Sequence, residues 1–348
     1  MASPELPFGM TEEELLTENL KPTSFINQYY HAASRGDLSD MPQLADSLST
    51  DLDHYYYQKF KDRFIDQVDG MDLATMPDPL LREVASLYQD YWRDTLLSPD
   101  QRVQHEQRLT EARASLLTGH NIDTTIEGAE AVVQQTLEDR GFGVLMGRTP
   151  PLLTFFVWAT THTQQYDVDL TDAMQAITVN VLEDYLCLDW FSYATFDNLA
   201  TGGWATKEAV FSVGNDPQSE IFTVSLLKHE ARHFADYALF PQLQGADLEY
   251  RAKLTELAFA EERLYELLEV FMSGAEETSH FPHPIANWHV TTHLSKLLLG
   301  TPWPHGDNPW SSLSIDAIHS AARDLLDRNT RALRDESYQF TQPVLGSG

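Results

Sequence analysis

The run His229-Glu230-Ala231-Arg232-His233 constrains the fold more than any other part of the chain. This H-E-x-x-H motif lies in residues 224–240, a stretch whose pattern predicts a helix. Residues four apart on a helix lie on one face, one turn above each other, so both imidazoles can reach the same metal ion. The glutamate beside the first histidine then points at the open position of that ion. The motif therefore predicts a metal-binding helix.

The residues around the motif are mostly apolar, including Leu226, Leu227, Phe234, Tyr237 and Phe240. A helix that is apolar on most sides is buried, and polar side chains on it need partners. A surface helix with solvated histidines, the alternative, leaves this apolar pattern unexplained. Zinc suits two imidazoles, because it keeps a position for water and lowers the pKa of that water to about 7, where a carboxylate can take its proton.

The third metal ligand is expected on the next helix. Pro241 and Gly245 predict the end of the motif helix and a turn, and Asp247 opens a second helix. A short loop makes two helices antiparallel neighbours, so Glu249 can lie opposite the motif histidines. Glu256, two turns further along the same face, is the alternative third ligand.

The motif and the run Glu249-Tyr250-Arg251-Ala252 together resemble the gluzincins, the thermolysin-like clan of zinc metallopeptidases. In that clan the glutamate on the second helix opens a pattern such as E-x-x-A-D. The resemblance covers roughly residues 224–262. It implies one Zn²⁺ per chain, bound by His229, His233 and Glu249. It also implies that Glu230 is the general base, which takes a proton from water and passes it to the leaving amine.

The chain departs from the gluzincin pattern at Lys253. The clan has an aspartate there, which accepts a hydrogen bond from a metal-bound histidine, and a lysine cannot accept one. Asp236 is the candidate for that role, because it lies three residues after His233 on the same helix face.

The resemblance further implies a histidine or tyrosine that stabilises the oxyanion from below the cleft, a contact worth about 3–4 kcal/mol of barrier. His289 and His293, again four residues apart, are the first candidates. Tyr250 and Tyr237 are the next. Ordinary buried or surface histidines remain the alternative for the second pair.

Composition excludes several classes of partner. The formal charge of −30, from 53 acidic and 23 basic residues, argues against nucleic acid and anionic membranes. One cysteine, Cys187, rules out an internal disulfide framework and a cysteine-based zinc site. Neither a signal peptide nor a membrane-spanning segment is apparent, so we expect either a cytoplasmic protein or a mature exported form. A peptide or protein substrate is the expected partner.

The pattern predicts a predominantly helical α+β protein with a zincin-like sheet beside the motif helix. Three regions are expected: a helical one at 1–150, a mixed β-sheet with the motif helix at 151–245, and a helical one at 246–348 that carries the third ligand. The helices are expected at residues 52–68, 79–97, 100–117, 127–137, 247–272, 287–299 and 312–334.

The strands are expected at residues 152–159, 176–181, 189–195, 209–213 and 221–224. Residues 209–213 are the candidate edge strand for substrate binding, and Gly202 and Gly203 allow a backbone to approach closely. His280 and His283, on either side of Phe281-Pro282, are expected in a loop.

Two functions are consistent with these patterns. The first is a zinc-dependent metallohydrolase, most simply a peptidase. The second is a non-catalytic helical binding or scaffold protein that keeps a structural or relic metal site. The number of protein ligands separates them, because a fourth ligand leaves no position for water.

Overall fold

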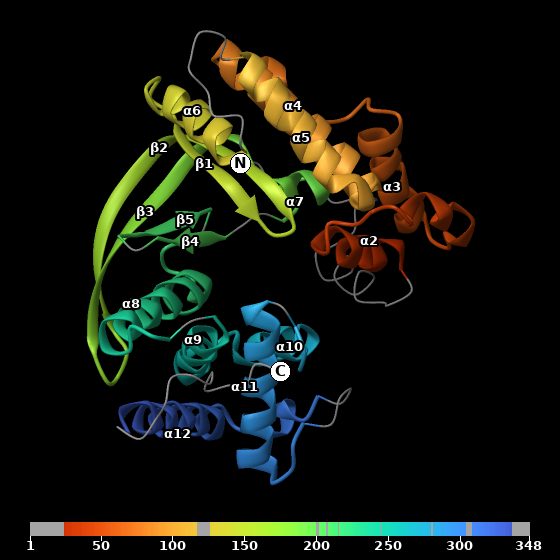
Figure 1. Ribbon diagram of the computed structural model, residues 1–348. Coiled ribbons are helices and arrows are strands. Elements are labelled where there is room, and N and C mark those ends of the chain that lie inside the picture. Colours follow the sequence, from red (N-terminus) through yellow and green to blue (C-terminus); the bar gives the residue numbers. More distant parts are fainter. Residues whose placement is uncertain are drawn as a thin grey trace. The chain divides into compact units, whose positions relative to one another are not determined.

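The computed structural model describes residues 24–116, 126–199, 202–206, 208–214, 216–243, 245–279, 281–303 and 308–335. These residues form a predominantly helical chain with one five-stranded sheet (Figure 1). The predicted α+β class is confirmed. The chain divides into two compact units, the first made of residues 1–161 and 182–201, the second of residues 162–181 and 202–348.

The first unit is built from helices around an apolar core. Its α-helices are α2 (Phe25–Ser34), α3 (Asp51–Phe60), α4 (Pro79–Leu97), α5 (Arg102–Leu116), α6 (Ile126–Glu138) and α7 (Trp190–Ala194). Helix α4 has the predicted bounds because Pro79 occupies its first turn and the carboxylate of Asp78 accepts a hydrogen bond from the backbone N–H of Leu81 (3.1 Å).

The strand predicted at 189–195 is wrong, because these residues form the short helix α7. The side chain of Asp189 accepts a hydrogen bond from the backbone N–H of Ser192 (2.9 Å), which caps a short helix. The aromatic residues that favoured a strand lie on this helix instead, and Trp190 and Tyr193 are buried.

The sheet has the strand order β1-β2-β3-β5-β4. Its strands are β1 (Gly143–Thr149), β2 (Leu152–Asp169), β3 (Met174–Cys187), β4 (Gly203–Ala205) and β5 (Val210–Val213). Strands β2 and β3 are longer than predicted and supply residues to both units. Strand β5 lies between β3 and β4, so the prediction that residues 209–213 form an edge is wrong. The edge strands are β4 and, at the other end of the sheet, β1.

In the second unit the sheet packs against the motif helix, α8 (His229–Leu239). The buried cluster between them contains Val168, Leu170, Ile177, Val179 and Val210 from the strands and their connection, and Phe222, Leu226, Leu227, Ala231 and Ala235 from the helical segment. This packing occupies one face of α8 and leaves the histidines on another.

A π-helical segment, η6 (Ile221–Lys228), leads directly into α8. The strand predicted at 221–224 is therefore wrong. The apolar run that favoured a strand is buried as a helix here, and short apolar runs do not distinguish the two. The wider π turn ends at Lys228, so the α-helical register begins with His229 itself.

Four more helices complete the second unit: α9 (Ala246–Phe259), α10 (Leu264–Ser273), α11 (Pro282–Leu299) and α12 (Ile315–Arg334). Helix α9 packs against α8, α11 and α12 (Figure 1). The single helix predicted at 247–272 is broken, because the Glu220 carboxylate accepts backbone N–H groups of Glu262 (3.2 Å) and Arg263 (2.6 Å) at the start of α10.

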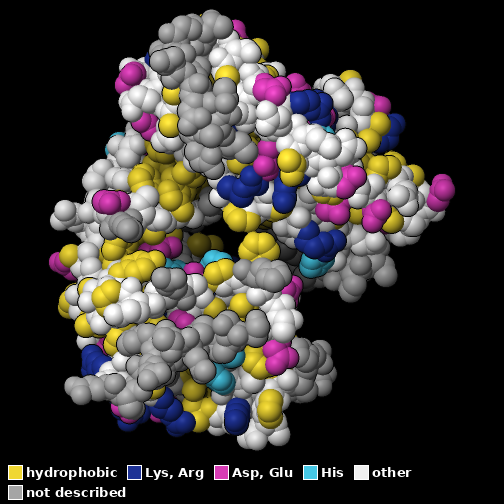
Figure 2. Space-filling view, in the orientation of Figure 1, with side chains coloured by type: hydrophobic (Ala, Val, Ile, Leu, Met, Phe, Trp, Pro, Cys, Tyr) yellow, Lys and Arg dark blue, Asp and Glu magenta, His cyan; other side chains and the backbone are white. Residues whose placement is uncertain are grey.

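The acidic side chains are spread over the face shown in Figure 2 and do not gather in one patch. This distribution is typical of a solvated acidic surface. Among the residues that the structure describes, no helix is both long and apolar enough to cross a membrane.

Candidate metal centre

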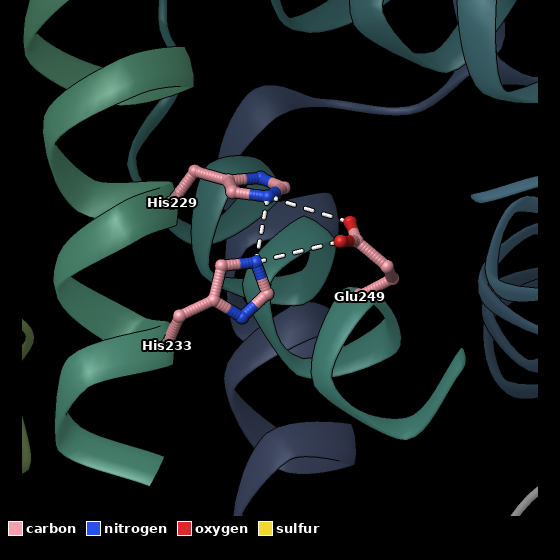
Figure 3. Close-up of side chains that lie close together, drawn as sticks. All are labelled: His229, His233 and Glu249. Atoms are coloured by element: carbon pink, nitrogen blue, oxygen red, sulfur yellow. Dashed lines mark hydrogen bonds and ion pairs between the residues drawn. The ribbon is translucent and has the colours of Figure 1, made fainter. Parts of the chain in front are cut away.

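Helices α8 and α9 bring three metal-ligating side chains together (Figure 3). The Nε2 atoms of His229 and His233 lie 3.0 Å apart. Nε2 of His229 lies 3.4 Å from Oε2 of Glu249, and Nε2 of His233 lies 3.5 Å from Oε1 of the same carboxylate. The three residues therefore converge from two helices on one point.

These distances suit a zinc ion. Ligand atoms 2.0–2.1 Å from a tetrahedral ion are about 3.3 Å from one another, within the range that separates these three groups. Two imidazole nitrogens and one carboxylate are a common set in catalytic zinc sites. In the described ranges this is the one group of three metal-ligating residues whose ligand atoms all lie within 4.8 Å of one another.

Glu256 lies behind His229. Nδ1–H of His229 donates a hydrogen bond to Oε1 of Glu256 at 2.7 Å, and both residues are buried. This bond fixes the ring so that its Nε2 atom is the one turned toward Glu249. Glu256, the alternative third ligand, thus supports a ligand from outside, and Glu249 is the carboxylate that faces both histidines.

Asp236 was predicted to accept a hydrogen bond from a metal-binding histidine, but it pairs with Arg251 instead. Its carboxylate accepts two hydrogen bonds from the guanidinium of Arg251, at 2.7 Å and 2.9 Å. Both residues are buried, and a buried guanidinium needs a counter-charge, so this pairing takes precedence over a histidine contact. The Nδ1 atom of His233 has no hydrogen-bond partner within the described part of the chain.

The carboxylates dominate the electrostatics of the site. Burial alone would lower the pKa of His229, but the charge of Glu256 and the hydrogen bonds to Glu249 and Glu256 raise this pKa to about 10. Burial raises the pKa of Glu249, whereas hydrogen bonds from His229, His233 and His283 hold it well below its usual range. The two carboxylates, Glu249 and Glu256, supply negative charge that a divalent cation can offset.

A cavity of about 930 Å³ opens onto the three ligands. Glu230, the residue between the motif histidines that was predicted to be the base, is among the residues that line it. Its other walls include aromatic and apolar side chains from several elements: Trp204 of β4, Phe234 and Tyr237 of α8, and Leu248 of α9.

The edge strand β4 also lines this cavity. Trp204 is paired with Phe211 of β5, and two residues further along the N–H of Thr206 bonds the carbonyl of Ala209 (2.8 Å). Alternate residues of an antiparallel strand direct their backbone groups to opposite sides. The backbone N–H and C=O groups of Trp204 are directed at β5. The backbone groups of its neighbours, Gly203 and Ala205, are therefore directed at the edge of the sheet.

Two of the residues predicted to stabilise the oxyanion lie at a second cavity. Tyr250 and His293 share a hydrogen bond of 2.9 Å and line this cavity of about 460 Å³. The ring of His289 lies next to that of His293, with their centres 5.5 Å apart. Tyr237, the remaining candidate, lines the cavity of the metal ligands. The oxyanion role stays a prediction for all four residues, and Tyr237 is the one that lines the same cavity as the ligands.

His283 is a residue of the site that the sequence did not predict. It was expected in a loop but lies in the first turn of α11, and its Nδ1 atom is 3.0 Å from Oε2 of Glu249. Pro282 marks the first position of this helix, a signal that would have moved the predicted start from 287 to 282. His280 lies outside the described residues.

No known protein family matches the chain, and no curated protein or solved structure shows detectable similarity to it. The gluzincin resemblance thus rests on the sequence of the motif and of the Glu249 run alone.

Proposed function

We propose that this chain is a zinc-dependent metallohydrolase that cleaves peptide bonds. The observation that carries the proposal is the convergence of His229, His233 and Glu249 at 3.0–3.5 Å, in a cavity that Glu230 also lines. When bound, zinc would lower the pKa of a water molecule and polarise the substrate carbonyl. The resident side chains supply the rest of the chemistry.

Glu230 is the general base of this proposal. It follows His229 on α8 and lines the same cavity as the ligand histidines. A carboxylate there takes a proton from the attacking water and delivers it to the leaving amine. Positioned proton transfer of this kind contributes about 10²–10⁴-fold to a rate.

The open edge of β4 is proposed as the peptide-binding strand. An extended peptide that pairs with an exposed edge gains backbone hydrogen bonds, whatever its sequence. The edge belongs to the same cavity as the metal ligands, so a peptide bound there passes them. Trp204 and Tyr237 offer apolar surface to its side chains, which favours a peptide or protein substrate.

The scaffold alternative requires a closed metal site, and the described residues do not favour one. Glu256 is held by Nδ1 of His229, and His293 faces the second cavity with Tyr250. Neither joins the three ligands as a fourth. A three-ligand site keeps a position for water, as hydrolytic zinc sites do.

Two measurements test the proposal. Protein purified without added metal should contain about one zinc ion per chain by elemental mass spectrometry. Glu230→Gln should keep this zinc while cleavage of a peptide library falls by about 10²–10⁴-fold. Glu262→Gln, which changes an exposed glutamate, is the control and should cleave like the wild type. Absence of zinc even after zinc is added back, or full cleavage by Glu230→Gln, contradicts the proposal.

A further inference from the structure

We propose that His283 is a positioning residue of the metal centre, which holds the carboxylate of Glu249 in place and so sets the affinity for the metal. The inference rests on the proposed metal site but goes beyond its three ligands. Nδ1 of His283 lies 3.0 Å from Oε2 of Glu249, nearer than either ligand histidine lies to that carboxylate.

Glu249 needs such a partner. Its side chain reaches the metal position through three rotatable bonds, and fixing them costs conformational entropy. Oε1 faces His233 and Oε2 faces His229, but once a metal is bound these contacts give way to bonds with the ion. His283 comes from a third helix and can keep its contact with the carboxylate while the carboxylate binds the ion.

The first turn of α11 lies next to the start of α9. Gly245, which precedes α9, has a φ of +53°, and a Cβ placed on it would lie 3.6 Å from Cγ of Pro282. The hydrogen bond between Tyr250 and His293 joins the same two helices a few turns away. These contacts, with the packing of α11 on α9, place His283 beside Glu249.

His283 is not a fourth ligand in this arrangement. In the part of the chain that the structure describes, the group whose ligand atoms lie within 4.8 Å of one another contains His229, His233 and Glu249 but not His283. The side chain of His283 is 62% exposed. The ring thus supports the carboxylate and leaves the water position free.

The test is the zinc affinity of position 283 variants, measured by competition with a fluorescent chelator. His283→Ala should bind zinc about 10–100-fold more weakly, as expected for loss of a group that contacts and positions a ligand from outside. His283→Asn should restore most of the affinity, because its amide nitrogen stands at the position of Nδ1. His283→Gln should not, because its amide nitrogen stands at the position of Nε2. His54→Ala, at an exposed histidine of the first unit, is the control.

The outcomes separate this inference from the proposed function. A wild-type chain that binds no zinc overturns the metal site itself, and the role of His283 with it. A wild-type chain that binds zinc, with equal affinity in His283→Ala, overturns the role of His283 alone. The inference is also overturned if His283→Asn binds zinc as weakly as His283→Ala, or if His283→Ala loses cleavage while its zinc affinity is unchanged.

Discussion

Helices α8 and α11 each carry two histidines four residues apart, but the two pairs lie in opposite surroundings. Beside the α8 pair stand the carboxylates of Glu249 and Glu256, and the pKa of His229 is raised to about 10. In the α11 pair, Nδ1 of His293 shares a hydrogen bond with the hydroxyl of Tyr250, and burial, with His293 next to it, lowers the pKa of His289 to about 4.

The helix between the pairs makes the difference. Glu249 and Tyr250 are consecutive on α9, and their side chains reach different histidine pairs. The α8 pair therefore lies beside the carboxylate of Glu249, which favours a bound cation. The α11 pair has the neutral hydroxyl of Tyr250 beside His293. Spacing places two imidazoles on one face, but the facing helix decides whether a metal is favoured there.

The largest effect should come from the α8 pair. His233→Ala removes one of three proposed ligands, so the zinc content should fall from about one ion per chain to almost none. His293→Ala makes the same change in the α11 pair and should leave the zinc content unchanged, because no carboxylate completes a site there within the described residues. Elemental mass spectrometry compares the two variants. Equal zinc loss in both would remove the distinction between the pairs.

The next effect concerns the support behind the α8 pair. Glu256→Gln replaces the carboxylate that accepts the Nδ1 proton of His229 by a neutral amide, a weaker acceptor. Zinc affinity should fall by about 10–100-fold. Chelator competition measures it, with Glu262→Gln as a control at an exposed site. An unchanged affinity would show that the carboxylate behind His229 does not contribute.

The parts of the site that the sequence predicts correctly are those fixed by local spacing. The motif histidines share a face because they are four residues apart on one helix. Glu249 faces them because the short connection that starts at Pro241 returns α9 along α8. The bounds of α4 follow in the same way from Asp78 and Pro79. Each of these features depends on a few neighbouring residues.

The parts that the sequence does not predict depend on contacts between distant residues. Asp236 pairs with Arg251 because both are buried together, and this leaves Glu256 to support His229. The position of β4 at the edge follows from strand order, which the pattern of residues 209–213 alone cannot give. His283 reaches Glu249 only because α11 packs on α9.

A smaller effect is expected at the α11 pair itself. Tyr250→Phe removes the hydroxyl that bonds Nδ1 of His293, so the free energy of unfolding should fall by about 1 kcal/mol. Zinc affinity and cleavage should stay at wild-type values, because this hydroxyl faces the second cavity. Urea unfolding and a cleavage assay measure the two quantities. Lost cleavage with zinc retained would return Tyr250 to the role of oxyanion donor.

The smallest effect is a dependence of stability on pH. The pKa of His289 is about 4 in the folded chain, below the ordinary value of 6.5. Between these values the unfolded chain binds more protons, so the free energy of unfolding falls as the pH falls through this window. His289→Asn lacks the titration, and from pH 7 to 4.5 the wild type should lose about 1 kcal/mol relative to this variant, allowing for the partial exposure of the ring.

Urea unfolding at several pH values measures this difference, and His54→Asn supplies the background for an exposed histidine. Close to His289 stands His293, whose own pKa is lowered by burial and by Lys296, so protonation of either ring opposes that of the other. Parallel stability curves for the wild type and His289→Asn would mean that this ring takes up a proton as readily as a solvated histidine. The contrast between the pairs would then come from the carboxylates around α8 alone.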